Sequence, residues 1–156
     1  MRCMAFWLVK TEPHVYSIDD LRRDKITAWT GVRNYQARNF LKQMEVGDLV
    51  LVYHSNAEPP GVVGVARVKH GAKADPTQFD RKSEYFDPAA SLEKPRWFCP
   101  DLAFSAKLAV MVTLESLRAQ ASLSGLQLLQ RGSRLSVLPV SEKHFDIIRA
   151  MGTGSL

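Results

Sequence analysis

The sequence predicts a single α+β domain, in which short helices are interspersed with mostly antiparallel strands. Hydrophobic residues make up 46% of the 156 positions, and no repeat, low-complexity tract or linker interrupts them, so one sizeable core is expected. Apolar residues recur at helical spacing in two segments, one in the first third of the chain and one near its end. Apolar runs of strand length lie between them, and their number suits a small barrel.

The first elements are a short strand and a short helix. Residues 5–9 form an apolar run that reads as a buried strand, and Pro13 interrupts its continuation. Ser17 and Asp20 have the spacing of a capping box, in which a hydroxyl and a carboxylate satisfy free N–H groups at a helix start. This spacing predicts a helix that runs to about Arg23.

The segment 33–44 is predicted to be an amphipathic helix. Arg38 and Lys42 are four residues apart, so one side of the helix is polar and positive. Arg33 falls on the apolar stripe when the stripe is continued backwards. Either the helix begins just after Arg33, or Arg33 is paired inside a pocket. The stripe itself consists of Ala37, Phe40, Leu41 and Met44.

Two apolar strands joined by a turn predict an antiparallel hairpin. Residues 48–54 and 62–68 are rich in Val and Leu, and the turn between them contains Pro59, Pro60 and Gly61. The polar stretch 71–100 follows, and we expect a long loop with short strand fragments there. A loop of this length in a compact domain is usually functional.

The C-terminal third is predicted to begin with a strand at 102–114, because apolar and polar residues alternate there. One or two short helices are expected within 117–129 and a brief strand at 134–137. Ser141 is predicted to cap a final amphipathic helix. The apolar residues of that helix are Phe145, Ile147, Ile148 and Met151.

Charge and cysteine content indicate the kind of partner and compartment. The formal charge is +5 and the pI about 9.4, which favours polyanionic partners because basic side chains release counterions condensed on phosphates. Cys3 and Cys99 form no CxxC or disulfide framework, so we expect a reducing, cytoplasmic location. The first apolar run breaks at Lys10, and neither a signal peptide nor a membrane span is expected. The domain is predicted to span 4–152, with flexible termini at 1–3 and 153–156.

Motifs for catalysis are absent from the sequence. There is no P-loop, dinucleotide-binding GxGxxG, HExxH, GxSxG or zinc-ligand spacing, so we predict no catalytic residues, metal or cofactor. His54 and Ser55 are the best catalytic candidates, but adjacent residues on a strand point to opposite faces and do not form a direct pair. We therefore expect a binding protein rather than an enzyme.

Aromatic residues beside polar and basic segments favour binding of a nucleic-acid base. Stacking of one base on an aromatic side chain contributes roughly 1–3 kcal/mol. Hydroxyl and amide groups next to the ring can then read the edge of the base. The alternative is that these aromatic residues pack in the core, and for most of them the sequence does not decide. The aromatic residues concerned are Trp29, Tyr35, Tyr53, Tyr85 and Trp97.

Several strings of the sequence resemble the EVE domain family. They occur in the family's order and cover nearly the whole chain. The longest are GVRNYQARNF and FWLVKTEP, and YHSN is also specific. The strings lie at residues 6–13, 16–21, 29–40, 53–56, 59–64, 77–80, 95–97 and 134–137.

The resemblance implies a PUA-like fold, a small bent antiparallel β-barrel flanked by short helices. It also implies binding of a modified base, notably a modified cytosine in DNA. Trp29 is then the first wall of an aromatic cage and Trp97 the second, with Ser55 and Asn56 on the strand end opposite Trp29. The predicted nucleic-acid- and base-binding residues are Lys10, Thr11, Trp29, Thr30, Arg33, Asn34, Tyr35, Arg38, Tyr53, His54, Ser55, Asn56 and Trp97.

One position departs from the family pattern. The family usually has Asp after the tryptophan, where this chain has Thr30. A neutral hydroxyl is a weaker partner than a carboxylate for Arg33 or for the exocyclic amine of a base. If Arg33 is paired, its partner is then another carboxylate, and the candidates are Glu12 and Asp80.

Three functions follow from these observations. The first is a reader of modified DNA bases, into whose pocket a flipped-out base enters at a cost of a few kcal/mol. The alternative is a PUA-like binder of structured or modified RNA, which needs contacts to the ribose hydroxyl. The third is an enzyme or sensor for a nucleotide-like ligand, using His54, Lys10 or Glu12. The sequence identifies no protein partner and no oligomeric state.

Overall fold

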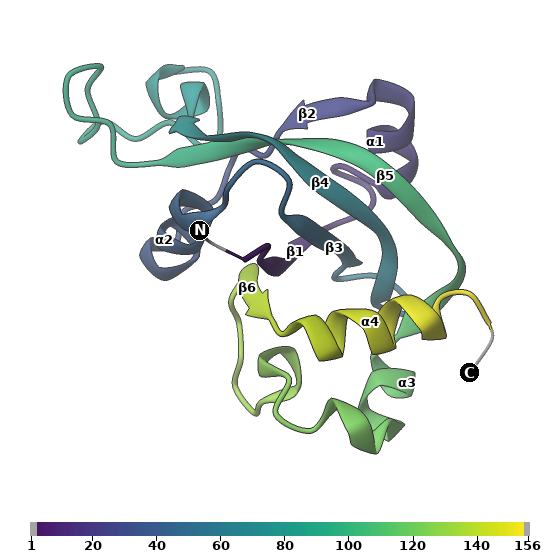
Figure 1. Ribbon diagram of the computed structural model, residues 1–156. Coiled ribbons are helices and arrows are strands. Elements are labelled where there is room, and N and C mark those ends of the chain that lie inside the picture. The colour runs from purple at the N-terminus through teal and green to yellow at the C-terminus, as the bar shows by residue number, and fades with distance from the viewer. Residues whose placement is uncertain (1–2, 155–156) are drawn as a thin grey trace.

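A computed structural model describes residues 3–154, which form one six-stranded sheet with four α-helices around it (Figure 1). The strands lie in the order β2-β5-β4-β3-β1-β6. The strands are β1 (Phe6–Thr11), β2 (Ile26–Ala28), β3 (Leu49–His54), β4 (Gly61–Ala74), β5 (Phe98–Thr113) and β6 (Val137–Val140). The helices are α1 (Ile18–Asp24), α2 (Tyr35–Gln43), α3 (Leu114–Ala119) and α4 (Glu142–Met151), with 3-10 turns η1 (Pro76–Phe79), η2 (Ala121–Leu123) and η3 (Gln127–Leu129).

The predicted α+β class is confirmed, and the sheet is mostly antiparallel. Only β1 and β3 pair in parallel among the described strands. Within residues 3–154, the short edge strands β2 and β6 do not pair with each other, so the sheet is open and the expected barrel is not confirmed. Residues 1, 2, 155 and 156 lie outside the described part, and the flexible termini stay a prediction.

The predicted hairpin is confirmed, since β3 and β4 pair antiparallel across the proline turn. The loop after it is shorter than predicted, because β4 runs to Ala74 and β5 begins at Phe98. These strand ends contain Gly71 and Pro100, which are unfavourable in strands, yet Ala74 still pairs with Phe98 and Lys73 with Cys99. Ladder hydrogen bonds rather than apolar alternation extend these strands. The last strand, β6, shares only Val137 with the predicted 134–137 and runs on to Val140, because these residues pair with β1.

Helix caps lie where the sequence predicts them. Ser17 and Asp20 form the capping box of α1, and Ser141 accepts the His144 backbone N–H at the start of α4. Helix α2 begins at Tyr35, with Asn34 as its N-cap, so the helix does begin after Arg33. No helix within the described residues is both long enough and apolar enough to cross a membrane.

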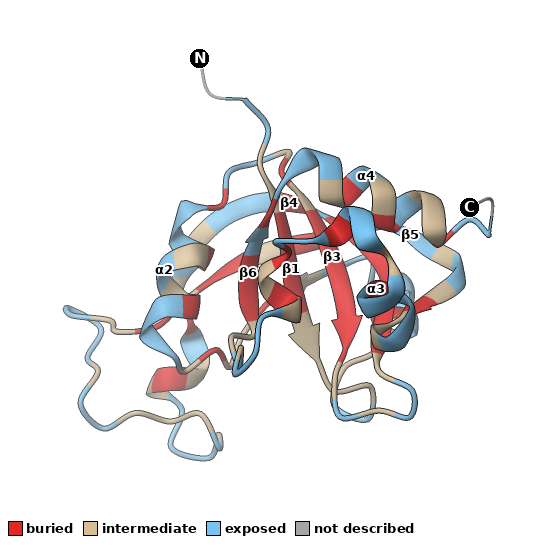
Figure 2. Cartoon of the chain, turned by 90° about the horizontal axis from the view of Figure 1, so that it is seen from below, coloured by how far each residue is buried: buried red, intermediate tan, exposed pale blue. Residues whose placement is uncertain are grey.

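The sheet is covered on both faces, which gives two cores (Figure 2). Alternate residues of β1 serve them: Trp7 and Val9 pack under α1 and α2, whereas Leu8 packs with Phe145 of α4. Trp7 also donates its indole N–H to the buried carboxylate of Asp48, at 3.0 Å. The strands between the two helical layers are therefore packed on both faces, and the loops at their ends extend from this core.

Candidate functional site

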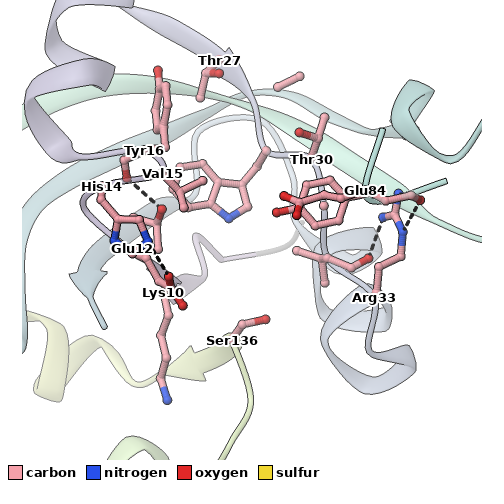
Figure 3. A pocket seen from close by; sticks show the side chains of 16 residues that line it. Lys10, Glu12, His14, Val15, Tyr16, Thr27, Thr30, Arg33, Glu84 and Ser136 are labelled. Atoms are coloured by element: carbon pink, nitrogen blue, oxygen red, sulfur yellow. Dashed lines mark hydrogen bonds and ion pairs between the residues drawn. The ribbon is translucent and has the colours of Figure 1, made fainter. Parts of the chain in front are cut away.

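A pocket of about 670 Å³ opens where the end of β1, the segment after β2 and the loop after η1 meet (Figure 3). We call it the Trp29 pocket. Five of the predicted binding residues line it: Lys10, Thr11, Trp29, Thr30 and Arg33. The other lining residues are Glu12, His14, Val15, Tyr16, Thr27, Ala28, Gly31, Val32, Glu84, Tyr85 and Ser136.

Trp29 is held rigidly in this pocket. Its backbone N–H donates to the carbonyl of Pro100 at 2.9 Å, and its ring packs edge-on against Tyr16, with centroids 6.2 Å apart. The indole N–H has no hydrogen-bond partner among residues 3–154. By contrast, the indoles of Trp7 and Trp97 donate to carboxylates. Trp29 therefore combines an ordered aromatic surface with a donor available to a ligand.

A buried carboxylate supports the far side of the pocket. Asp75 is fully buried, and its Oδ2 accepts the Gly31 N–H at 2.8 Å and Arg33 Nη1 at 3.1 Å. Burial raises the pKa of Asp75, but hydrogen bonds from Thr77, Gly31 and Arg33 outweigh burial and hold that pKa below its ordinary value. Arg33 is thus paired inside the structure as well as placed before α2. The expectation that Glu12 or Asp80 pairs with Arg33 is wrong, because Asp75 does so.

Asp75 reaches Arg33 because the ends of the long loop are joined. The Asp75 N–H donates to the carbonyl of Trp97 at 2.9 Å, and Gln78 also donates to that carbonyl. This closes the loop at its base and turns Asp75 toward the start of α2. The sequence gives no local signal for that pairing, since Asp75 and Arg33 are 42 residues apart.

Arg33 also positions Tyr85, a second aromatic residue of the pocket. Its Nε and Nη2 both donate to the backbone carbonyl of Tyr85, at 3.1 and 2.9 Å. The Tyr85 ring lies so close to Gly31 that an added Cβ would be 2.9 Å from it, and Gly31 has a φ of +87°. Glycine is therefore required there on both counts. Tyr85 is one of the aromatic residues that lie beside polar segments, but it is not one of the predicted site residues.

The pocket carries charges of both signs. Burial lowers the pKa of Lys10 and raises that of Tyr85, whose pKa is raised further by Glu84 and Glu12. Glu12 pairs with His14 at 3.1 Å. In Figure 3, Lys10, Glu12 and His14 lie on one side of the pocket and Glu84 and Arg33 on the other. A ligand in this space meets both hydrogen-bond donors and acceptors.

Tyr35, Arg38 and Trp97 lie outside the lining of the pocket. Tyr35 stacks on Trp97 with ring centroids 4.9 Å apart, and Trp97 donates its indole N–H to Asp87 at 2.7 Å. Arg38 donates to the carbonyl of Arg96 at 2.9 Å, and the Arg33 guanidinium lies 5.3 Å from the Trp97 ring. The cluster therefore supports Arg33 from behind, and Trp97 is only 6% exposed.

The remaining predicted residues also lie outside that lining. Tyr53 is buried in the core that contains Phe145. The Ser55 N–H donates to the carbonyl of Thr11 at 3.0 Å, which fixes the end of β1 at the pocket. Asn56 occupies a turn with a φ of +49°. Asn34 caps α2 and lines a separate, neighbouring hollow.

His54 joins α1 to the sheet. Its Nε2 accepts the backbone N–H of Ile18 at 3.1 Å, so this bond needs the neutral imidazole. Burial is the main cause that lowers the pKa of His54; Lys107 lowers it further, and Asp19 opposes both. Among the described residues, no group of three or more His, Cys, Asp or Glu side chains is placed to hold a metal ion.

His54 is expected to make stability depend on pH near neutrality. Because its folded pKa lies below the unfolded value of about 6.5, the unfolded chain binds more protons in acid. The stabilisation is complete above about pH 6.5 and is lost as the pH falls through the folded pKa. Urea unfolding at pH 7.5 and pH 5.5 should show a smaller pH effect in His54→Gln, whose amide oxygen can still accept the Ile18 N–H. Identical pH effects in both proteins would contradict this role.

The chain is similar to known proteins both in sequence and in structure. A family model described as the EVE domain matches residues 5–151. Thymocyte nuclear protein 1 of Mus musculus is 36% identical over 165 residues, covering 94% of this chain and 73% of the mouse protein. A hypothetical protein from Leishmania major has a TM-score of 0.92 at 45% identity, covering 97% of this chain and 96% of its own.

The structure of human THYN1 in complex with 5-methylcytosine-containing DNA has a TM-score of 0.89 at 34% identity. It covers 95% of this chain and 97% of the human chain. The family match leaves only a few residues at each end uncovered, and the relatives align along nearly the whole chain. The protein therefore belongs to the EVE domain family.

Proposed function

We propose that this protein is a non-enzymatic nucleic-acid-binding module that holds a modified cytosine of DNA in the Trp29 pocket. Homology to human THYN1, whose solved complex contains 5-methylcytosine DNA, supports nucleic-acid binding. The observation that carries the pocket assignment is Trp29 itself. It packs edge-on against Tyr16, lines the pocket together with Tyr85 and presents an indole N–H that no described residue uses.

The chemistry of the pocket suits the edge of a cytosine. Cytosine has an amine donor at N4 and acceptors at N3 and O2. The carboxylates of Glu12 and Glu84 can accept from an amine, whereas the Trp29 N–H and Lys10 can donate to ring acceptors. With Thr30 in place of the usual Asp, we assign recognition of the amine to these two glutamates. A base stacked and paired inside a duplex cannot enter a pocket lined on several sides, so the proposal includes base flipping.

His54, the best catalytic candidate of the sequence, makes a hydrogen bond between elements of the fold. His54 is 8% exposed, lies outside the Trp29 pocket and uses its Nε2 to accept the Ile18 N–H. Lys10 and Glu12 do line the pocket, but no nucleophile, base and orienting group are hydrogen-bonded in series there. We expect no turnover when the protein is incubated with a panel of nucleotides.

Trp29→Ala is expected to weaken binding to methylated DNA by roughly 5- to 150-fold, corresponding to about 1–3 kcal/mol of stacking on one aromatic side chain. Fluorescence anisotropy with matched oligonucleotides measures this, using 5-methylcytosine or cytosine at one position, in single- and double-stranded DNA. Trp29→Phe is the matched control, because it keeps the aromatic face and removes the indole N–H. Matched RNA strands test the alternative of an RNA reader.

The wild-type protein is expected to prefer the methylated strand, and Trp29→Ala to keep only the weak, salt-sensitive binding of a basic surface. Circular dichroism must show that the variant is folded, since Trp29 is only 7% exposed. Equal affinity of the wild-type protein for modified and plain strands would refute the proposal. Tighter binding of the matched RNA would move the function to the RNA alternative.

A further inference from the structure

A second hollow lies beside the N-terminal end of α2. Its volume is about 340 Å³. One side consists of Asn34 and Gln36, at the start of α2, and the other is formed by η3 and the turn that follows it. We call it the 127–135 hollow. The turn contributes two arginines, Arg131 and Arg134, and no acidic or aromatic side chain lines the hollow.

The 127–135 hollow adjoins the Trp29 pocket at two places along the chain. Arg33 lines the pocket and Asn34 the hollow; likewise Ser136 lines the pocket and Leu135 the hollow. The Lys10 N–H donates to the Ser136 carbonyl at 2.9 Å, which ties this shared rim to β1. The two sites are therefore neighbours along both of these chain segments.

The polar groups of the hollow suit an anion. Arg131 and Arg134 are exposed and form no ion pair with residues 3–154. Helix α2 has nine residues and no acidic side chain in its first turn, so the positive end of its dipole is uncompensated. Ser133 also lines the hollow, and its Oγ is buried without a hydrogen-bond partner among the described residues. That hydroxyl is itself inaccessible to solvent, so the two guanidinium groups and the helix end are the groups that an anion meets in the hollow.

We infer that the 127–135 hollow binds a backbone phosphate of the strand whose base occupies the Trp29 pocket. This inference rests on the proposed function. A phosphate fits better than a second base, because the hollow has two guanidinium groups and no aromatic surface for stacking. The two sites divide the work: the pocket distinguishes bases, whereas the hollow fixes the strand and carries no sequence information.

The test is the double variant Arg131→Gln/Arg134→Gln. The matched control, Arg22→Gln/Lys143→Gln, removes the same charge from exposed positions that line neither site. For a methylated strand at low salt, we expect roughly 5- to 20-fold weaker binding than in the control. The plot of log affinity against log salt should flatten by about 1. The ratio of affinities for methylated and plain strands should not change.

A methylphosphonate scan locates the phosphate. Charged phosphates near the modified base are replaced one at a time by an uncharged methylphosphonate. The replacement should weaken binding by the wild-type protein at a single position of the strand. At that position the double variant should show no further loss. A position-independent effect in the wild-type protein would overturn the inference.

The outcomes separate the two claims. If the double variant binds like the control while the wild-type protein still prefers methylated DNA, the inference is wrong and the proposed function stands. If the double variant loses the preference itself, the hollow is part of base recognition and the inference is again wrong. If the wild-type protein shows no preference but the double variant weakens and flattens binding of plain strands, the phosphate site stands and the proposed function fails. Absence of any binding overturns both.

Discussion

Replacement of Asp75 by alanine is expected to lower the free energy of unfolding by about 3–5 kcal/mol, as when one partner of a buried ion pair is removed. Asp75 is fully buried, and its carboxylate accepts hydrogen bonds from Gly31, Thr77 and Arg33. Alanine leaves the Arg33 guanidinium without its counter-charge. This is costly because only 21% of the Arg33 side chain is exposed to water.

The same change is expected to abolish the preference for methylated DNA. Arg33 holds the Tyr85 carbonyl through two hydrogen bonds, and Tyr85 is a wall of the Trp29 pocket. Without Asp75, both Arg33 and the Gly31 backbone lose the group that orients them. The pocket then loses its shape even where the domain remains folded.

Urea unfolding and anisotropy on the same samples measure the two effects of the Asp75 variants. Asp75→Asn is the matched control: it keeps the size of the side chain and one acceptor oxygen but removes the charge. We expect it to be intermediate in stability between wild type and alanine. An alanine variant within about 1 kcal/mol of wild type would show that the Arg33–Asp75 pair is not the anchor that its burial implies.

Phe145→Ala is expected to reduce stability by a similar amount, about 3–5 kcal/mol, but to leave selectivity intact. Phe145 is 1% exposed, and its ring lies 4.8 Å from that of Phe6, in the core on the other side of the sheet from Trp29. The loss comes from removed apolar contacts and the cavity they leave. No residue of the Trp29 pocket belongs to this core.

Denaturant unfolding measures the stability of Phe145→Ala, and Phe145→Leu, which leaves a smaller cavity, should lose less. Binding is measured in the cold and only on samples that circular dichroism shows to be folded. The comparison with Asp75→Ala is the informative one, since two variants of similar stability should differ in selectivity. A folded Phe145→Ala protein that no longer prefers methylated DNA would mean that both cores shape the pocket.

Local features of the fold could be predicted from the sequence. The caps at Ser17 and Ser141 are encoded within three residues, and the hairpin of β3 and β4 by two apolar runs around a proline turn. The limits of β4 and β5 could not be predicted, because their ends, which contain Gly71 and Pro100, are held by ladder hydrogen bonds between residues far apart in sequence. Hydrophobicity carries no information on such pairs.

The site was only partly predictable for the same reason. Trp29 can be recognised because it lies beside polar residues. The residues 50–53 of β3 are buried on both faces of the sheet, so their sequence has no alternation of apolar and polar residues that would show which face carries a site. Tyr53 proves to belong to the core with Phe145. The anchor of the pocket, Asp75, depends on the closure of a loop at Trp97, which no short motif encodes. Tyr85 enters the site through that same loop.

The three tryptophans differ in a way that makes the protein its own optical probe. Trp7 and Trp97 each donate the indole N–H to a carboxylate, Asp48 and Asp87, and neither lines the Trp29 pocket. Trp29 alone among them faces that pocket with an indole N–H that no described residue engages. A base stacked there should quench and shift the emission of one tryptophan against a constant background from two. Binding can then be followed by intrinsic fluorescence, without a dye on either protein or DNA.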